Sequence, residues 1–111
     1  MKPLLNTTLL FLLVIGFSGS VSGQDFEETK RLAEQGDVVA QSHLGLMYAT
    51  GEGVLQNNLR AYVWWSVAAA QGYERAKTNR DILVDRLTPE QLARGQDMST
   101  RCFESDYQDC E

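Results

Sequence analysis

Few residues in this chain have the chemistry of a catalytic or metal-binding site. His43 is the single histidine among 111 residues. Acid–base and nucleophilic catalysis need a histidine, serine, cysteine or carboxylate held in a defined mutual arrangement. The sequence places no serine or cysteine nucleophile, carboxylate pair or glycine-rich phosphate loop in such an arrangement with His43. We therefore interpret His43 as an ordinary side chain on a helix face, and we predict no catalytic residue, no cofactor and no metal ligand.

The two cysteines, Cys102 and Cys110, are best explained by a disulfide in an exported protein. Disulfides persist in oxidising compartments, where an even pair of thiols most simply forms one bond. Eight residues of continuous helix span about 12 Å, whereas a disulfide holds its Cα atoms about 4.4–6.8 Å apart. The helix must therefore end between the two cysteines, and we expect the turn at Ser105-Asp106. A metal-binding or redox pair is the alternative, which the missing C-x-x-C spacing disfavours.

Two further groups of residues have more than one interpretation. Trp64 and Trp65 could stack on a sugar or an aromatic ligand, but their position in a helical pattern favours core packing. Asp106, Asp109 and Glu111 could hold a cation loosely, yet they lack the spacing of a calcium loop. We interpret these three acidic residues as solvated charge.

The first 23 residues have the order of a secretory signal peptide. Lys2 gives a positive start, residues 9–17 form an apolar block, and small residues fill most of 18–23. Such a block is too short for a membrane-spanning helix, which needs about 20 residues. Cleavage after Gly23, or after Ser22, would leave no membrane span, and an uncleaved anchor is the alternative. We expect a periplasmic or secreted protein.

Composition and charge indicate one small acidic globular domain. The chain is 43% hydrophobic and 23% charged, with only two prolines. Ten Lys and Arg residues against fifteen Asp and Glu give a net charge of −5. Removal of the signal peptide would take away Lys2 and make the net charge −6. Because binding to nucleic acid or anionic lipid relies on clustered cations, we predict neither as a partner.

Hydrophobic spacing predicts about five helices after the signal peptide. Their expected ranges are 26–35, 38–50, 58–71, 74–87 and a last helix that starts at Thr88-Pro89. Glycine takes positive φ without steric cost, so we expect Gly51 to end a helix and Gly53 to shape the following loop. Asn57 is a suitable N-cap for the next helix. Thr88 and Gln91 predict a capping box around Pro89.

A repeat with an offset of 36 residues links two parts of the chain. The identical pairs are Ala33/Ala69, Gln35/Gln71, Gly36/Gly72 and Ala40/Ala76, and Leu46/Ile82 is one of the similar pairs. Fixed periods of about 20–50 residues are typical of stacked helical units. Small residues such as Gly45 and bulky ones such as Trp64 fall where two helices would meet. This alternation predicts close helix-on-helix packing.

The motifs within this repeat resemble the Sel-one-like repeat (SLR) family, whose members are related to tetratricopeptide helical hairpins. Residues 40–48 match an A-x-x-x-L-G-x-x-Y opening, residues 51–54 match G-x-G-V, and residues 61–72 match A-x-x-W-x-x-x-A-A-x-Q-G. The matching residues are Ala40, Leu44, Gly45, Tyr48, Gly51, Gly53, Val54, Ala61, Trp64, Ala68, Ala69 and Gly72. The resemblance implies an all-α fold, a short right-handed α/α solenoid of antiparallel helix pairs.

This pattern divides the chain into five segments. They are a signal peptide (1–23), a leading half-repeat helix (24–36), a complete repeat (37–72), a partial repeat or capping helix (73–87), and a C-terminal capping helix with a disulfide-closed tail (88–111). Asn57 stands where the family usually has Asp, and Arg80-Asp81 stands where Leu-Gly is expected. The helix that contains Arg80 is therefore expected to have a polar face and to terminate the array.

The resemblance implies a non-enzymatic module that binds another protein or a peptide, as an adaptor or scaffold in the bacterial cell envelope. Val39, His43, Leu46 and Thr50 fall on one stripe of the helix 38–50, beside its core stripe. Because the first helix of each pair lines the concave side of such arrays, we predict that this stripe, with Gln41, contacts the partner. The alternative is that the stripe packs against a neighbouring helix.

Two other functions remain open from the sequence. Some cysteine-rich secreted members of the family are linked to cell-wall fragments or β-lactams, which suggests a protein that binds or hydrolyses such ligands. Those members carry cysteine pairs within their repeats, whereas Cys102 and Cys110 lie only in the tail. A purely structural or oligomerising role is the third possibility.

Overall fold

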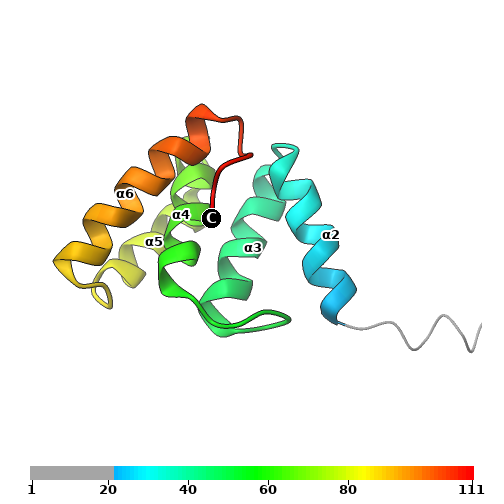
Figure 1. Cartoon of the computed structure of the whole chain (residues 1–111), viewed down its shortest axis with the longest axis horizontal. Coiled ribbons are helices and arrows are strands. Elements are labelled where there is room, and N and C mark those ends of the chain that lie inside the picture. Colours follow the sequence, from blue (N-terminus) through cyan, green and yellow to red (C-terminus); the bar gives the residue numbers. More distant parts are fainter. Residues whose placement is uncertain (1–21) are drawn as a thin grey trace, which may run out of the picture.

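The structure, a computed structural model, describes residues 22–111, and this part of the chain is helical without any strand. The five helices are α2 (Ser22–Glu34), α3 (Val38–Thr50), α4 (Asn58–Ala70), α5 (Glu74–Val84) and α6 (Pro89–Glu104). Consecutive helices pack from α2 to α5, and α6 returns to pack on α4 (Figure 1). The predicted all-α class with five helices is confirmed, and the arrangement is compatible with a small helical solenoid.

The predicted signal peptide falls mainly on residues 1–21, which lie outside the described part of the chain. Its last two residues, Ser22 and Gly23, are the first residues of α2. Cleavage at this point stays a prediction.

The helix ends of α3 and α4 follow from their capping residues. The Asp37 carboxylate accepts a hydrogen bond from the Ala40 N–H at 3.0 Å and so begins α3. Gly51 ends α3 in the left-handed conformation with φ 78°, and its N–H donates to the Met47 carbonyl at 2.8 Å. Asn57 caps α4 by accepting from the Arg60 N–H at 3.0 Å. The predicted roles of Gly51 and Asn57 are confirmed.

The boundary between α5 and α6 differs in part from expectation. α5 ends at Val84, whereas the spacing predicted an end at Leu87. After Val84 the chain tightens into a turn with three-residue hydrogen bonds, in which the Arg86 N–H donates to the Leu83 carbonyl at 2.9 Å and the Leu87 N–H to the Val84 carbonyl at 3.1 Å. α6 starts as predicted, because the Thr88 hydroxyl accepts from the Gln91 N–H at 3.1 Å and the Gln91 side chain accepts from the Thr88 N–H at 2.9 Å.

α3 and α4 meet where a glycine faces a tryptophan. A Cβ atom placed on Gly45 would lie 2.5 Å from the Trp65 ring, so only glycine admits this approach. The Trp65 Nε1 donates to the Ser42 carbonyl at 2.9 Å, which fixes the ring. Trp64 is fully buried beside it. Both tryptophans therefore belong to the core, as predicted.

Most of the residues that match the repeat pattern also belong to this core. The buried ones are Ala40, Leu44, Gly45, Tyr48, Ala61, Trp64 and Ala68, and Val54 and Ala69 are partly buried against them. Gly53 and Gly72 have positive φ values of 75° and 92° and lie in turns. The residues at these matched positions therefore lie at interhelical contacts and at chain reversals.

α6 docks on α4 through a second glycine. A Cβ atom on Gly95 would lie 2.7 Å from the Tyr62 ring and 3.2 Å from Leu59. Met98 and Cys102 lie on the same face of α6 and are buried. This face gives α6 a hydrophobic stripe that packs on α4, and Phe103 lies outside it with an exposed fraction of 45%.

The tail after α6 reverses direction and is closed by a disulfide. α6 ends at Glu104, and Asp106 and Tyr107 take positive φ values of 54° and 67°. Cys102 and Cys110 are bonded, with their Cα atoms 4.3 Å apart. The predicted disulfide and the predicted end of the helix between the two cysteines are both confirmed.

The closed tail reaches back to the first helices of the chain (Figure 1). The Gln108 side chain donates to the Glu34 carbonyl at 2.8 Å. The Tyr48 hydroxyl donates to the Glu111 carboxylate at 2.7 Å. Glu111 is exposed, as the interpretation of solvated charge expects, but its carboxylate is also bound by a side chain from α3. Asp109 is exposed as well, and its carboxylate lies 3.8 Å from the Arg101 Nε.

Candidate functional site

One face of α3 is exposed although the rest of the helix is covered by α2 and α4. Val39, His43, Leu46 and Thr50 are all exposed, with exposed fractions of 58% for Val39 and 43% for Leu46. Steps of four, three and four residues put these side chains on one side of a helix. We call these four residues the α3 surface.

The exposure of the α3 surface bears on one of its two predicted roles, the packing against a neighbouring helix. Its four side chains are open to solvent, so the alternative that they pack against a neighbouring helix was wrong. Two large apolar side chains, Val39 and Leu46, lie on either side of His43 along this face. Single exposed apolar residues are common, whereas two on one rigid helix face form a small patch suited to contact.

Gln41 does not belong to the α3 surface, and its prediction as a contact residue was wrong. Its side chain is fully buried. The Gln41 Nε2 donates to the Ala33 carbonyl at 3.1 Å, and its Oε1 accepts from the Gln71 side chain at 2.6 Å. A buried amide needs such partners, so Gln41 joins α2, α3 and the end of α4. It lies two residues from the stripe and therefore points to another side of the helix.

His43 has no catalytic partner in the part of the chain that the structure describes. No hydrogen bond from its side chain to another described residue is formed, and residues 22–111 hold no group of three His, Cys, Asp or Glu side chains that could bind a metal ion. The Thr50 hydroxyl is hydrogen-bonded within α3, because it donates to the Leu46 carbonyl at 2.9 Å. The large apolar side chains that the α3 surface presents to solvent are Val39 and Leu46.

The sequence offset pointed to one more exposed apolar residue that the predicted surface did not include. Ile82 of α5 lies 36 residues after Leu46 and is 59% exposed. The offset of 36 residues thus relates two exposed branched side chains, one on α3 and one on α5, with α4 between these helices in the chain. Asp81 beside it accepts from Arg80 and Lys77, and these hydrogen bonds lower the pKa of its carboxyl group.

No protein-family model matches this chain, and no curated protein matches its sequence. Membership of the SLR family therefore stays a prediction from the motifs. Within residues 22–111, none of the helices has the length and apolar character needed to cross a membrane.

Proposed function

We propose that this chain is an exported SLR-like module that binds another protein or a peptide through the α3 surface. In this proposal the protein is not an enzyme and works as an adaptor or scaffold in the periplasm or outside the cell. The observation that carries the proposal is the exposure of Val39 and Leu46 on a helix whose other faces are packed. The disulfide between Cys102 and Cys110 supports an oxidising compartment.

The physical basis of binding would be a rigid apolar contact. Full burial of one valine or leucine side chain is worth about 1.5–3 kcal/mol, part of which is offset by the loss of freedom on association. α3 is already held by α2 and α4, so little further ordering would be needed. His43 between the two apolar side chains would add a polar contact that selects among partners.

The test compares two variants of the mature chain, residues 24–111, as bait in capture from envelope extracts. His43→Ala combined with Leu46→Ser should lose the captured protein. Leu55→Ser is the matched control, because Leu55 is 88% exposed and lies in the loop before α4, away from the α3 surface. The control should retain the captured protein. Circular dichroism should show the same helicity for both variants and for the unmodified chain.

Two results would count against the proposal. Equal capture by both variants would show that the α3 surface is not the contact. A rise in the melting temperature with peptidoglycan fragments or penicillin, without any captured protein, would favour the alternative of a cell-wall or β-lactam ligand.

A further inference from the structure

Two helix pairs of the chain are closed by the same turn. Between α2 and α3, the Gly36 N–H donates to the Ala33 carbonyl at 3.0 Å. Between α4 and α5, 36 residues later, the Gly72 N–H donates to the Ala69 carbonyl at 2.9 Å. The two glycines have similar positive φ values of 97° and 92°. α5 is therefore oriented on α4 as α3 is oriented on α2.

α5 carries an exposed stripe that corresponds to the α3 surface. The residues that follow the four members of the α3 surface by 36 positions are Arg75, Asn79, Ile82 and Arg86. Ile82 is 59% exposed, both arginines are exposed and Asn79 is partly exposed. We call these four residues the α5 stripe. Because the two helix pairs are equivalent, the α3 surface and the α5 stripe lie on the same face of the molecule, which we call the shared face.

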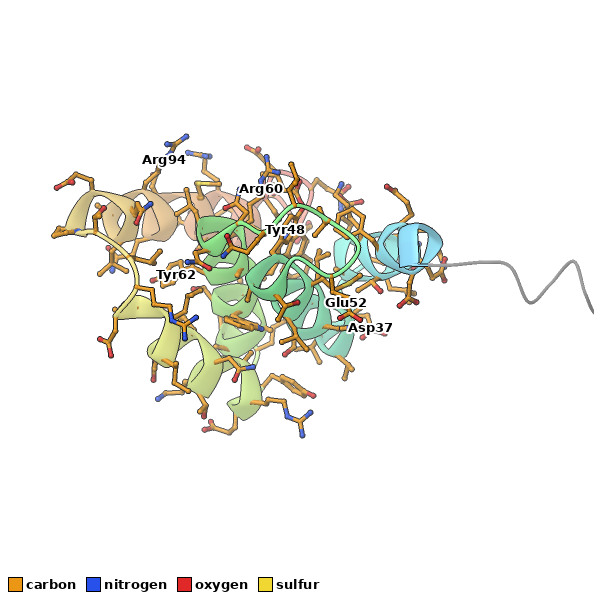
Figure 2. All side chains as sticks on the ribbon, turned by 90° about the horizontal axis from the view of Figure 1, so that it is seen from below. Asp37, Tyr48, Glu52, Arg60, Tyr62 and Arg94 are labelled. Atoms are coloured by element: carbon orange, nitrogen blue, oxygen red, sulfur yellow. A yellow bond between two sulfur atoms is a disulfide. The ribbon has the colours of Figure 1, made fainter. Side chains whose placement is uncertain are left out.

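The shared face is turned away from the C-terminal tail. Tyr48 points from α3 toward the tail, where its hydroxyl meets the Glu111 carboxylate. Leu46 and Thr50 stand two positions before and after Tyr48, and two positions turn a helical side chain by about 200°. In Figure 2, Tyr48 and α6 lie toward one side of the molecule and α5 lies toward the other. The tail therefore leaves the shared face open.

The α5 stripe adds positive charge to the shared face. Neither Arg75 nor Arg86 forms an ion pair or a side-chain hydrogen bond within residues 22–111. α3 contains no carboxylate, and neither does the α5 stripe. The shared face thus combines the apolar side chains of Val39, Leu46 and Ile82 with two guanidinium groups that have no partner in the described chain.

The carboxylates of the α5 segment lie on a different side. Glu74, Asp81 and Asp85 each stand one residue before a member of the α5 stripe, which turns their side chains by about 100°. On α3 the corresponding side packs on α4, as the contact of Gly45 with Trp65 shows. On α5 the same side forms the outer end of the array, since α5 makes no contact of comparable extent with α6.

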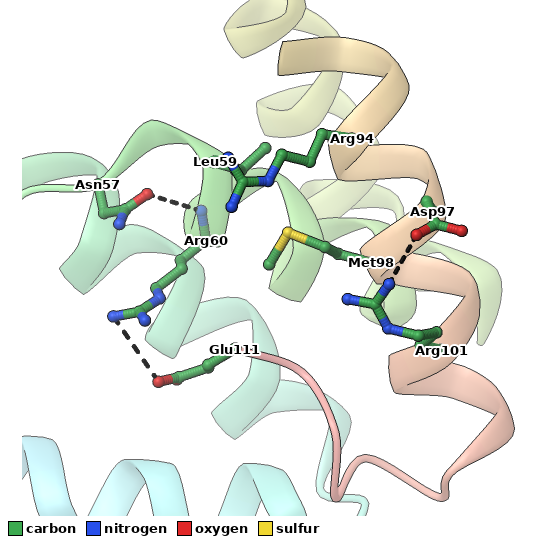
Figure 3. A pocket seen from close by; sticks show the side chains of 8 residues that line it. All are labelled: Asn57, Leu59, Arg60, Arg94, Asp97, Met98, Arg101 and Glu111. Carbon is green, nitrogen blue, oxygen red and sulfur yellow. Dashed lines mark hydrogen bonds and ion pairs between the residues drawn. The ribbon is translucent and has the colours of Figure 1, made fainter. Parts of the chain in front are cut away.

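Arginines on the tail side of the molecule are held differently. The Arg101 guanidinium lies 2.6 Å from the Asp97 carboxylate, and the Arg60 guanidinium is turned toward Glu111 at 3.9 Å (Figure 3). Arg94 on α6 is exposed and forms no ion pair within residues 22–111. Arg94 is therefore matched to the two arginines of the α5 stripe in exposure and pairing, but it lies away from the shared face.

We propose that the partner of this chain is a protein segment that is both acidic and amphipathic. Its apolar side chains contact Val39, Leu46 and Ile82. Its carboxylates pair with Arg75 and Arg86, since a guanidinium holds a carboxylate through two parallel, charge-assisted hydrogen bonds. This inference rests on the proposed function, because it takes the α3 surface as the contact.

The spacing of the two arginines defines the partner further. They stand 11 residues apart in the sequence. This separation corresponds to about 16 Å along a helix axis, so each guanidinium binds a separate carboxylate. The partner segment therefore carries two acidic groups about 16 Å apart, with an apolar stripe between them.

Nuclear magnetic resonance titration of a chain of residues 24–111 tests the proposal with three synthetic helical peptides. All three share one stripe of leucines, and two positions that are 11 residues apart carry glutamate, glutamine or lysine. The glutamate peptide should shift the backbone amide signals of Leu46 and Ile82 and should bind most tightly, and the lysine peptide should bind most weakly. The advantage of the glutamate peptide should shrink as salt is added, because salt screens exposed charges.

Variants of the chain assign the preference for the glutamate peptide to the α5 stripe. Arg75→Gln combined with Arg86→Gln should weaken binding of the glutamate peptide by roughly fivefold, since each exposed ion pair contributes modestly. The same variant should leave the affinity for the glutamine peptide unchanged. Arg94→Gln is the matched control and should bind all three peptides as the unmodified chain does. Circular dichroism should show equal helicity for every variant.

The outcomes separate this inference from the proposed function. Equal affinity for the glutamate and glutamine peptides would overturn the inference, as would equal weakening by the Arg94 variant and the variant of the α5 stripe. If His43→Ala combined with Leu46→Ser still abolished capture from envelope extracts, the proposed function would stand without an acidic partner. An absence of shifts on α3 and α5 with the glutamate peptide would likewise overturn the inference, and the capture experiment would decide the proposed function by itself.

Discussion

The hairpin of α3 and α4 and the C-terminal half of the chain are held together by different means. α3 and α4 each bury seven residues, whereas α5 buries two and α6 buries three. The hairpin closes by local packing, with the Trp65 ring seated on Gly45. The C-terminal half depends on contacts between residues far apart in the sequence, among them Gln108 with Glu34 and Glu111 with Tyr48.

This difference shows how a short array can be closed at its end. A helix such as α5, with a mostly polar surface, cannot bury enough apolar area to hold the end of an array by itself. α6 packs back on α4, and its tail fastens the last helix to the first pair. The disulfide restricts the conformations that the tail can adopt. Less conformational entropy is therefore lost when the tail is ordered by its polar contacts.

The largest expected effect comes from removal of the disulfide by the double variant Cys102→Ala and Cys110→Ala. Closure of so short a loop is worth about 2–3 kcal/mol of stability. Urea denaturation of a chain of residues 24–111 should show a loss of this size. Amide hydrogen exchange should become much faster in α6 and the tail. The amides of α3 and α4 should keep most of their protection against exchange.

Equal acceleration of exchange across all helices would contradict this expectation. It would mean that the hairpin and the C-terminal half unfold as one unit. Gln108→Ala is the milder control, because it removes the tail contact to Glu34 without opening the covalent loop.

The hairpin could be predicted from the sequence because its signals are local. Asp37 and Asn57 stand beside the N–H groups that they cap, and Gly51 follows the last buried turn of α3. The end of α5 was predicted three residues too late, because apolar spacing does not distinguish the last turn of an α-helix from the tighter turn that follows Val84.

The docking of α6 on α4 could not be predicted in the same way. Gly95 and Tyr62 are far apart in the sequence, and only the fold shows that a Cβ atom on Gly95 would lie 2.7 Å from the Tyr62 ring. Glu111 has no local signal that points to Tyr48. For the α3 surface, helical spacing identified the four exposed residues, but the burial of Gln41 depends on Ala33 and Gln71, which belong to other segments.

A second prediction compares the two glycine contacts directly. Gly45→Ala and Gly95→Ala both place a Cβ atom against an aromatic ring, at 2.5 Å from Trp65 and 2.7 Å from Tyr62. Alanine gains about 1 kcal/mol of helix propensity, and overpacking costs about 1–3 kcal/mol. Trp65 is held by its hydrogen bond to Ser42, so Gly45→Ala should lose about 1–2 kcal/mol in chemical denaturation.

Gly95→Ala should lose less than about 1 kcal/mol, because the Tyr62 hydroxyl forms no hydrogen bond to another residue in the described range and its ring can shift. A larger loss for Gly95→Ala than for Gly45→Ala would reverse the comparison. It would show that the contact between α4 and α6 is the more rigid one.

The smallest effect concerns the contact between Tyr48 and Glu111, which joins the two regions. Burial raises the pKa of the Tyr48 hydroxyl, and its hydrogen bond to the Glu111 carboxylate raises it further. The folded state therefore favours the neutral tyrosine. Its contribution to stability is complete below the ordinary tyrosine pKa of about 10 and is lost as the pH rises above that value.

Tyr48→Phe should lose about 1 kcal/mol at neutral pH, where the hydrogen bond is intact. The difference in the free energy of unfolding between Tyr48→Phe and the unmodified chain should then shrink as the pH rises above about 10, because only the unmodified chain must keep a buried tyrosine neutral. Urea denaturation at several alkaline pH values measures this difference, and constant spacing of the two curves would contradict it. Glu111→Gln separates the causes, since it removes the carboxylate charge and leaves Tyr48 buried. The pH dependence should then weaken without disappearing, because burial is the larger of the two causes.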